Sequence, residues 1–149
     1  MPEKKTMERA QRDKAQGKSP STQAGEFVRE EIEHIRHGKH GARSTKQAIA
    51  IGLQKARRAG VKLPPPAKGT TSERTRESAV HAIEEGRAHK KPSARRSRAT
   101  REALKHEGHS AASPKALSRQ ASSAARRRSA ASRSEAAKKA AKTRKRAGH

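Results

Sequence analysis

Large apolar side chains are scarce in this chain, and their scarcity limits what it can fold into. Only 15 of its 149 residues are Val, Ile, Leu, Met or Phe, and the other hydrophobic residues are 28 alanines. A chain this poor in large apolar residues and this highly charged usually buries too little surface to offset the entropy lost on ordering. We therefore expect a mostly α-helical protein with large disordered regions rather than one domain-sized globule.

The excess of basic residues indicates the class of partner. Lys and Arg number 38 against 14 Asp and Glu, which gives a net charge of +24, and such a field attracts phosphate polymers. Because the chain has no cysteine, disulfides, thiolate catalysis and cysteine-based zinc sites are excluded. The sequence shows neither an apolar run long enough to span a membrane nor the apolar core of a signal peptide. We expect a cytoplasmic protein with no membrane partner.

Residues 26–37 have the apolar spacing of an amphipathic helix. Val28, Ile32 and Ile35 fall on one helical face, and Gly38 is a natural left-handed helix end. The pattern predicts a helix that ends just before this glycine.

A second helix is predicted by the signals at its two ends. Ser44 and Gln47 have the spacing of a capping box. Gly60 supplies a left-handed end, after which Val61 can fold back onto Ala56 as in a Schellman cap. We expect this helix to begin after Ser44 and to end before Gly60.

A short loop joins these two helices, which favours antiparallel pairing. The resulting helical hairpin, residues 22–63, is the one unit that we expect to be folded. The predicted contacts join Val28, Ile32 and Ile35 to Ile49, Leu53 and Ala56. A hairpin of about 40 residues is marginal by itself, so a partner or association into a homo-oligomer is a candidate source of stability.

The other segments are predicted as an arm, a linker, a short helix and a tail. Residues 1–21 are polar, show no sustained helical stripe and are expected to be a disordered arm. A Pro-rich linker at 64–70 precedes a short helix at 71–89, whose apolar face lies before Gly86. Residues 90–149 are a basic low-complexity tail of Ala, Ser, Arg and Lys. We expect this tail to be disordered when free and helical where phosphates neutralise its charge.

The basic tail has the clearest functional signal. From Gly108 onward, 12 Lys and Arg accompany a single carboxylate, Glu135, and blocks of like charge are typical of interaction segments. Such cations release counterions from a phosphate backbone, which gives an affinity that falls with salt. The alternative is a tail that only promotes solubility. The tail residues expected to bind nucleic acid are Arg95, Arg96, Arg126, Arg127, Arg128, Lys138, Lys139, Lys142, Arg144, Lys145 and Arg146.

Base reading is not expected from this composition. Phe27 is the only aromatic residue, so the chain has no platform of rings on which bases could stack. We therefore expect little sequence preference.

The loop between the hairpin helices offers a second candidate contact with phosphate. Lys39, His40 and Arg43 precede the second helix and Lys46 lies in its first turn. The free amides and dipole of a helix N-terminus favour an anion there. An ordinary helix–helix turn explains the same residues equally well, and the two interpretations stay open.

A group of histidines and glutamates raises the question of a metal or acid–base site. Nothing in the sequence supplies a second ligand-bearing helix, and the same residues are expected on the solvated face of an amphipathic helix. We therefore predict no metal, no cofactor and no enzymatic activity, because so small a core cannot enclose a pocket. The residues concerned are His34, His37, His40, Glu30, Glu31 and Glu33.

Two resemblances bear on identity. Residues 25–66, with Gly38-Lys39-His40-Gly41-Ala42-Arg43-Ser44 followed by KQAIAIGLQKARRAG, resemble an uncharacterised bacterial family of small basic proteins with a KQAIAIxLxxARxAG signature. This resemblance implies a bacterial origin and no particular chemistry. The tail from Ser110, with Ser113-Pro114-Lys115 and AAKKAAKTRKRA, is similar to linker-histone tails and bacterial histone-like proteins. That likeness implies DNA binding and compaction, although no winged-helix domain accompanies it.

These observations together predict non-sequence-specific DNA binding, with histone-like association with the nucleoid as its cellular form. The first alternative is an RNA- or ribosome-associated protein that uses the same electrostatics. The second alternative is a protein-interaction module whose hairpin docks onto an acidic partner.

Overall fold

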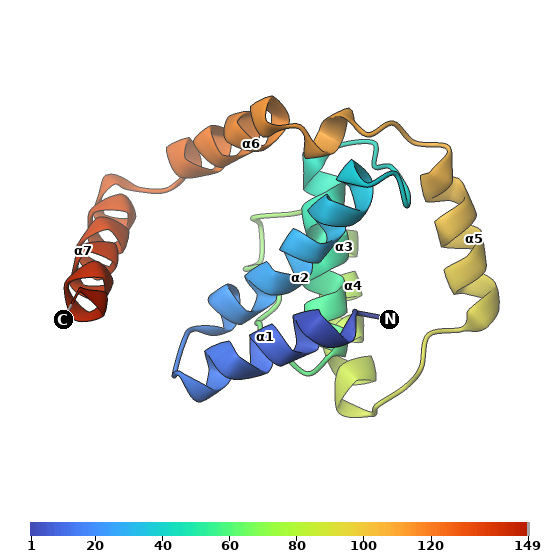
Figure 1. Ribbon diagram of the computed structural model, residues 1–149, viewed down its shortest axis with the longest axis horizontal. Coiled ribbons are helices and arrows are strands. Elements are labelled where there is room, and N and C mark those ends of the chain that lie inside the picture. Colours follow the sequence, from blue (N-terminus) through green and yellow to red (C-terminus); the bar gives the residue numbers. More distant parts are fainter. Residues whose placement is uncertain (149) are drawn as a thin grey trace. The chain divides into compact units, whose positions relative to one another are not determined.

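The computed structural model describes residues 1–148, and within them the chain forms seven α-helices, one 3₁₀ helix and no strand (Figure 1). The expectation of large disordered regions is wrong, because helices occupy most of the chain between Lys4 and Ala147. The elements are α1 (Lys4–Ala15), α2 (Pro20–Arg36), α3 (Thr45–Arg58), α4 (Glu73–Arg87), α5 (Ala94–Lys105), η1 (Ser110–Ala112), α6 (Pro114–Arg127) and α7 (Ala130–Ala147).

Alanine forms much of the core. A count of large apolar residues therefore underestimates how much of the chain can be buried. Nine of the twelve buried hydrophobic residues in the described chain are alanines. Small side chains let helix backbones approach closely, so a dense interior forms with few large groups. Phe27 and Ile35 are fully buried among them.

The chain divides into two compact units, Met1–Ser113 and Pro114–His149. The first contains α1 to α5 and η1, together with every residue that is buried in the described structure. The second contains α6 and α7, neither of which buries a residue. None of the described helices combines the length and the apolar character that crossing a membrane requires.

Helices α2 and α3 pair in opposite directions and pack closely at a glycine. A Cβ atom added to Gly52 would lie 2.6 Å from the Cα atom of Val28. The buried side of α3 is a stripe of small residues, Ala48, Gly52 and Ala56. The expected contact through Ile49 and Leu53 is therefore only partly correct, because both residues are half-buried beside this stripe.

Both predicted end signals of α3 are present. The Ser44 hydroxyl accepts a hydrogen bond from the Gln47 amide, as expected of an N-cap. At the other end, Gly60 adopts a φ of +88°. Its amide donates to the Arg57 carbonyl and the Val61 amide donates to the Ala56 carbonyl, each at 3.1 Å. These are the two hydrogen bonds of a Schellman cap.

Helix α1 corrects the prediction of a disordered arm at residues 1–21. Ala10 lies in one buried cluster with Ala24, Phe27 and Ala56. Arg9 and Glu26 form a partly buried ion pair between α1 and α2 at 2.5 Å. The arm is ordered because its inward face consists of small and polar residues that the hairpin can accommodate.

Helix α4 lies within the predicted short helix at 71–89 and packs against α3, with Gly86 in its last turn. A Cβ atom on Gly86 would lie 2.4 Å from the Arg57 carbonyl oxygen, so this glycine permits a close helix contact. The left-handed residue that follows the helix is His89, with a φ of +49°.

The tail prediction at residues 90–149 also needs correction, because this segment forms the helices α5, α6 and α7. Alanine has the highest intrinsic helix propensity. The Ser93 and Ser129 hydroxyls cap α5 and α7 by accepting from the Arg96 and Ser132 amides. Local capping and alanine content together outweigh the repulsion expected among the basic residues.

Candidate functional site

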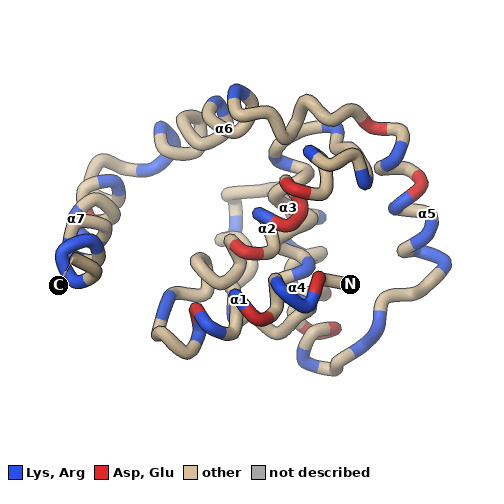
Figure 2. Tube along the Cα trace, in the orientation of Figure 1, with Lys and Arg blue, Asp and Glu red and all other residues tan. Residues whose placement is uncertain are grey.

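The unit formed by α6 and α7 carries a concentrated positive charge. Residues 114–149 contain 12 Lys and Arg and one carboxylate, Glu135. Figure 2 shows Lys and Arg distributed along both helices. Glu135 forms an ion pair with Lys138 at 3.3 Å, with both side chains about three-quarters exposed. The remaining cations of this unit are therefore free of internal carboxylates in the part that the structure describes.

Helix α6 gathers its cations on one side. Arg119, Arg126 and Arg127 line an open surface depression with Ser122 and Ser123. Arg119 and Arg126 are seven residues apart, a spacing that places both on one helical face. The Arg127 guanidinium donates to the Ser123 hydroxyl at 3.0 Å. This surface offers several cationic and hydroxyl donors to an anion.

Helix α7 differs because its Lys and Arg surround the helix. It has no buried residue and no apolar stripe that could dock onto a core. The predicted binding residues Lys138, Lys139, Lys142, Arg144, Lys145 and Arg146 are all exposed. Arg128, in the turn before α7, donates to the Ser132 hydroxyl at 3.0 Å.

The remaining predicted cation pair belongs to the other unit. Arg95 and Arg96 lie in the first turn of α5 and are both exposed. Both side chains are therefore accessible to solvent within the first unit.

The loop between α2 and α3 has internal partners at the positions proposed to bind phosphate. The amides of Gly41 and Ala42 donate to the Leu104 and Gly108 carbonyls at 2.8 and 3.0 Å. Lys39 and His40 lie against carboxylates of the same unit, whereas Lys46 stays exposed. These contacts favour the structural interpretation of the turn over a phosphate site.

Arg43 stays largely exposed at the same loop. Its guanidinium lies 3.7 Å from a Glu107 carboxylate oxygen, while its side chain is 81% exposed. Phosphate binding by the loop therefore remains a prediction that rests chiefly on Arg43 and Lys46.

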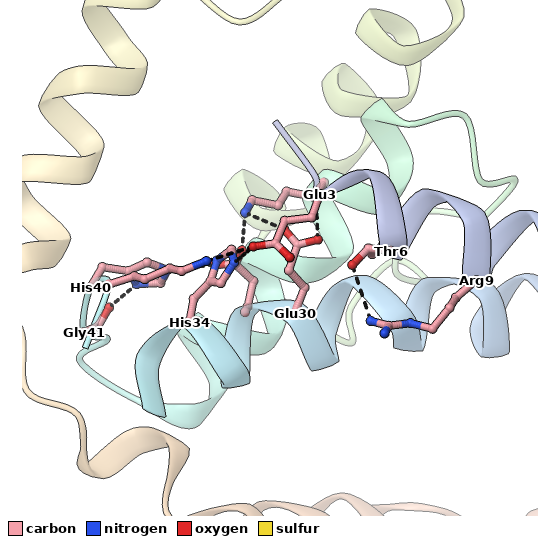
Figure 3. A network of polar contacts seen from close by, with 10 residues as sticks. Glu3, Thr6, Arg9, Glu30, His34, His40 and Gly41 are labelled. Carbon is pink, nitrogen blue, oxygen red and sulfur yellow. Dashed lines mark hydrogen bonds and ion pairs between the residues drawn. The ribbon is translucent and has the colours of Figure 1, made fainter. Parts of the chain in front are cut away.

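A cluster of buried and half-buried charges joins the N-terminal residues, α2, the loop and α3 (Figure 3). Glu30 and Glu31 are only 2% and 1% exposed, so their assignment to a solvated helix face is wrong. The Lys55 ammonium of α3 forms an ion pair with Glu31 and lies 3.5 Å from Glu30. The burial of these two glutamates is tolerated because the Lys55 ammonium offsets part of their negative charge.

Two histidines complete this charged cluster. The His40 ring contacts Glu31 through Nε2 at 3.2 Å and donates from Nδ1 to the Gly41 carbonyl oxygen at 2.9 Å. The His34 ring lies 2.9 Å from Glu3 through Nε2 and 3.7 Å from Glu31 through Nδ1. The sequence shows the i, i+3 spacing of Glu31 and His34 and a loop that contains His40, but not that this loop returns His40 to Glu31.

Glu3 is held at the edge of this cluster by Lys39 and His34. Its carboxylate accepts from the Lys39 ammonium at 2.8 Å, and its amide donates to Glu30 at 3.0 Å. The hydrogen bond from Lys39, followed by that from His34, lowers the pKa of Glu3 from 4.5 to about 2. Glu3 therefore remains charged and keeps the start of the chain tied to α2.

The comparisons with known proteins give one partial match. Residues 11–68 match the model of a family of unknown function (DUF6496). This span includes the end of α1, the whole of α2 and α3, and the proline segment after α3. No curated protein and no solved structure matches the chain. The match agrees with an uncharacterised domain family around the hairpin and names no activity.

Proposed function

We propose that the chain binds duplex DNA without strong sequence preference, through the unit formed by α6 and α7. The observation that carries this proposal is the accumulation of 12 cations beside one carboxylate in a unit without buried residues. Each Lys or Arg that neutralises a phosphate releases condensed counterions, and this release supplies affinity without reading bases.

The position of the single aromatic residue supports low specificity. Phe27 is fully buried in the first unit, and the sequence contains no Trp or Tyr. Bases cannot stack on a ring that is inside the core, so recognition by stacking on aromatic side chains is not available. Contacts with phosphates remain the main source of binding energy.

The arginine face of α6 provides a sharp test. In the full chain, replacing Arg119, Arg126 and Arg127 with Gln removes three cations from this face. We expect weaker duplex binding and a slope of log affinity against log salt that is less steep by about 2.7, or about 0.9 for each lost phosphate contact.

A matched triple substitution distinguishes this face from net charge alone. Lys5, Arg12 and Lys14 are exposed on α1, and changing them to Gln removes the same charge from the other unit. We expect this control to leave the slope almost unchanged. If both triple variants reduced the salt slope equally, the result would contradict binding through α6. The effect would then come from the net charge of the chain alone.

A competition binding experiment at one salt concentration tests whether DNA or RNA is the preferred ligand. The proposal expects duplex DNA to displace a labelled duplex at least as well as a structured RNA does. Preferential displacement by the RNA favours an RNA- or ribosome-associated role for the same cations. Association with the nucleoid and histone-like compaction are the cellular consequences that we propose for the DNA-binding form.

A further inference from the structure

The charged cluster beneath the loop has the donor set of a metal site. We propose that Glu31, His34 and His40 bind a first-row divalent cation such as Zn²⁺. One ligand atom from each residue lies within 4.8 Å of the others. Imidazole nitrogens and a carboxylate oxygen are ligands that Zn²⁺ takes, commonly three from the protein with a fourth position left to water.

The fold brings these donors together from two adjacent segments. Glu31 and His34 are one turn apart on α2, and His40 returns from the loop that follows. Around a tetrahedral Zn²⁺ with bonds of about 2.1 Å, neighbouring ligand atoms are roughly 3.4 Å apart. The cluster therefore needs only a modest contraction to close on the ion.

The orientation of His40 fits metal binding. Its Nδ1–H group donates to the Gly41 carbonyl oxygen at 2.9 Å, so Nε2 is the ring nitrogen that remains to bind the ion, which displaces any proton there. That nitrogen lies 3.2 Å from Glu31 Oε2. Metal-bound histidines characteristically donate their second N–H group to a carbonyl or a carboxylate in this way.

His34 has the equivalent arrangement with a carboxylate. Its Nε2 atom lies 2.9 Å from Glu3 Oε1, and its Nδ1 atom faces Glu31 at 3.7 Å. The Glu3 carboxylate thus occupies the outer position of a carboxylate–histidine–metal arrangement. Both rings are held with their free nitrogens toward the same carboxylate.

The local charge balance also leaves room for a cation. Glu3, Glu30 and Glu31 face the ammonium groups of Lys39 and Lys55, so one negative charge remains when both imidazoles are neutral. The Oε1 atom of Glu30 is buried and has no hydrogen-bond partner in the described structure. Because this atom lies 3.5 Å from Lys55 Nζ, Lys55 can shift to Glu30 when a metal ion takes its place on Glu31.

The test is titration of the metal-free full chain with ZnCl₂, followed by calorimetry and by the thermal unfolding midpoint. We expect one Zn²⁺ per chain and a higher unfolding midpoint. His34→Gln should weaken binding by at least tenfold, whereas the matched control His37→Gln should bind as the unmodified chain does, because His37 is exposed and outside the cluster. Absence of Zn²⁺ binding, or equal affinity in these two variants, overturns the proposal.

A second pair of variants answers the objection that His34→Gln disturbs folding. Glu3→Gln keeps the size of this half-exposed side chain and removes the charge that it offers to His34 and Lys39. Glu8→Gln removes an exposed carboxylate of α1 that lies 3.9 Å from Lys4 and outside the cluster. We expect Glu3→Gln to weaken Zn²⁺ binding by about 10- to 100-fold and Glu8→Gln to leave it unchanged. Equal affinity in these two variants counts against the proposal.

Discussion

At the residue scale, the closest helix contact of the hairpin depends on the absence of one side chain. Gly52→Ala places a Cβ atom 2.6 Å from the Val28 backbone, so α2 and α3 must move apart. We expect a loss of about 1–3 kcal/mol in the free energy of unfolding, as for other overpacked interiors. Chemical denaturation of the full chain measures this loss.

Gly25 on α2 is the matched control for Gly52. A Cβ atom at Gly25 would meet nothing within 4 Å, and Ala is the better helix former by about 0.8–1 kcal/mol. Gly25→Ala should therefore stabilise the protein or leave it unchanged. A similar change in the free energy of unfolding for both substitutions would contradict the close approach of α2 and α3.

The buried pair of glutamates makes Lys55 another critical residue. Lys55→Met removes the ammonium group that contacts Glu30 and Glu31 while keeping much of the side-chain volume. Because breaking a buried ion pair leaves uncompensated charge, we expect a destabilisation of about 3 kcal/mol. Urea unfolding compares this variant with Lys46→Met, whose lysine is exposed on the same helix. Equal stability of the two variants would contradict the role given to the cluster.

Residue-scale features were predictable where the physics is local. Ser44 and Gly60 act within one helical turn, and their capping roles follow from residue type and spacing. The burial of Glu30 and Glu31 was not predictable, because it depends on Lys55 from another helix and on His40 returning through the loop. Contacts between elements leave no periodic signal in a single sequence.

At the element scale, α1 is the helix that apolar periodicity did not predict. Ala10 is 6% exposed within the cluster that includes Phe27, whereas Ala15 is exposed near the end of the same helix. Ala10→Gln should lower the free energy of unfolding by about 1–3 kcal/mol through overpacking and an unpaired amide. Ala15→Gln should change it by no more than about 0.5 kcal/mol.

The same stability measurement decides whether α1 is part of the folded unit. A disordered arm would respond weakly to both substitutions, because neither position would pack against α2. Equal unfolding free energies for Ala10→Gln and Ala15→Gln would therefore contradict the docking of α1.

Helix positions were partly predictable, and the errors have a common cause. Apolar periodicity indicated the second half of α2, but small and polar residues on the inner face of α1 gave no comparable stripe. Gly86 has the residue type of a helix end, yet its contact with the Arg57 carbonyl belongs to packing with α3. Close packing through Ala and Gly is invisible to rules that count large apolar residues.

At the scale of the whole molecule, the two units have different charge distributions. The first unit contains 13 of the 14 acidic residues, and its cluster around Glu31 pairs several of them with cations. The second unit retains a single carboxylate among 12 Lys and Arg. Packing and ion pairing dominate the first unit, whereas the second presents charge to solvent, as the proposed binding role requires.

The most direct test of that role is the dissociation constant of the full chain and a random-sequence duplex, measured at several NaCl concentrations. If about six cations contact phosphates together, log affinity should fall against log salt with a slope of roughly −5. A slope near zero would contradict binding of DNA through the Lys and Arg residues of α6 and α7.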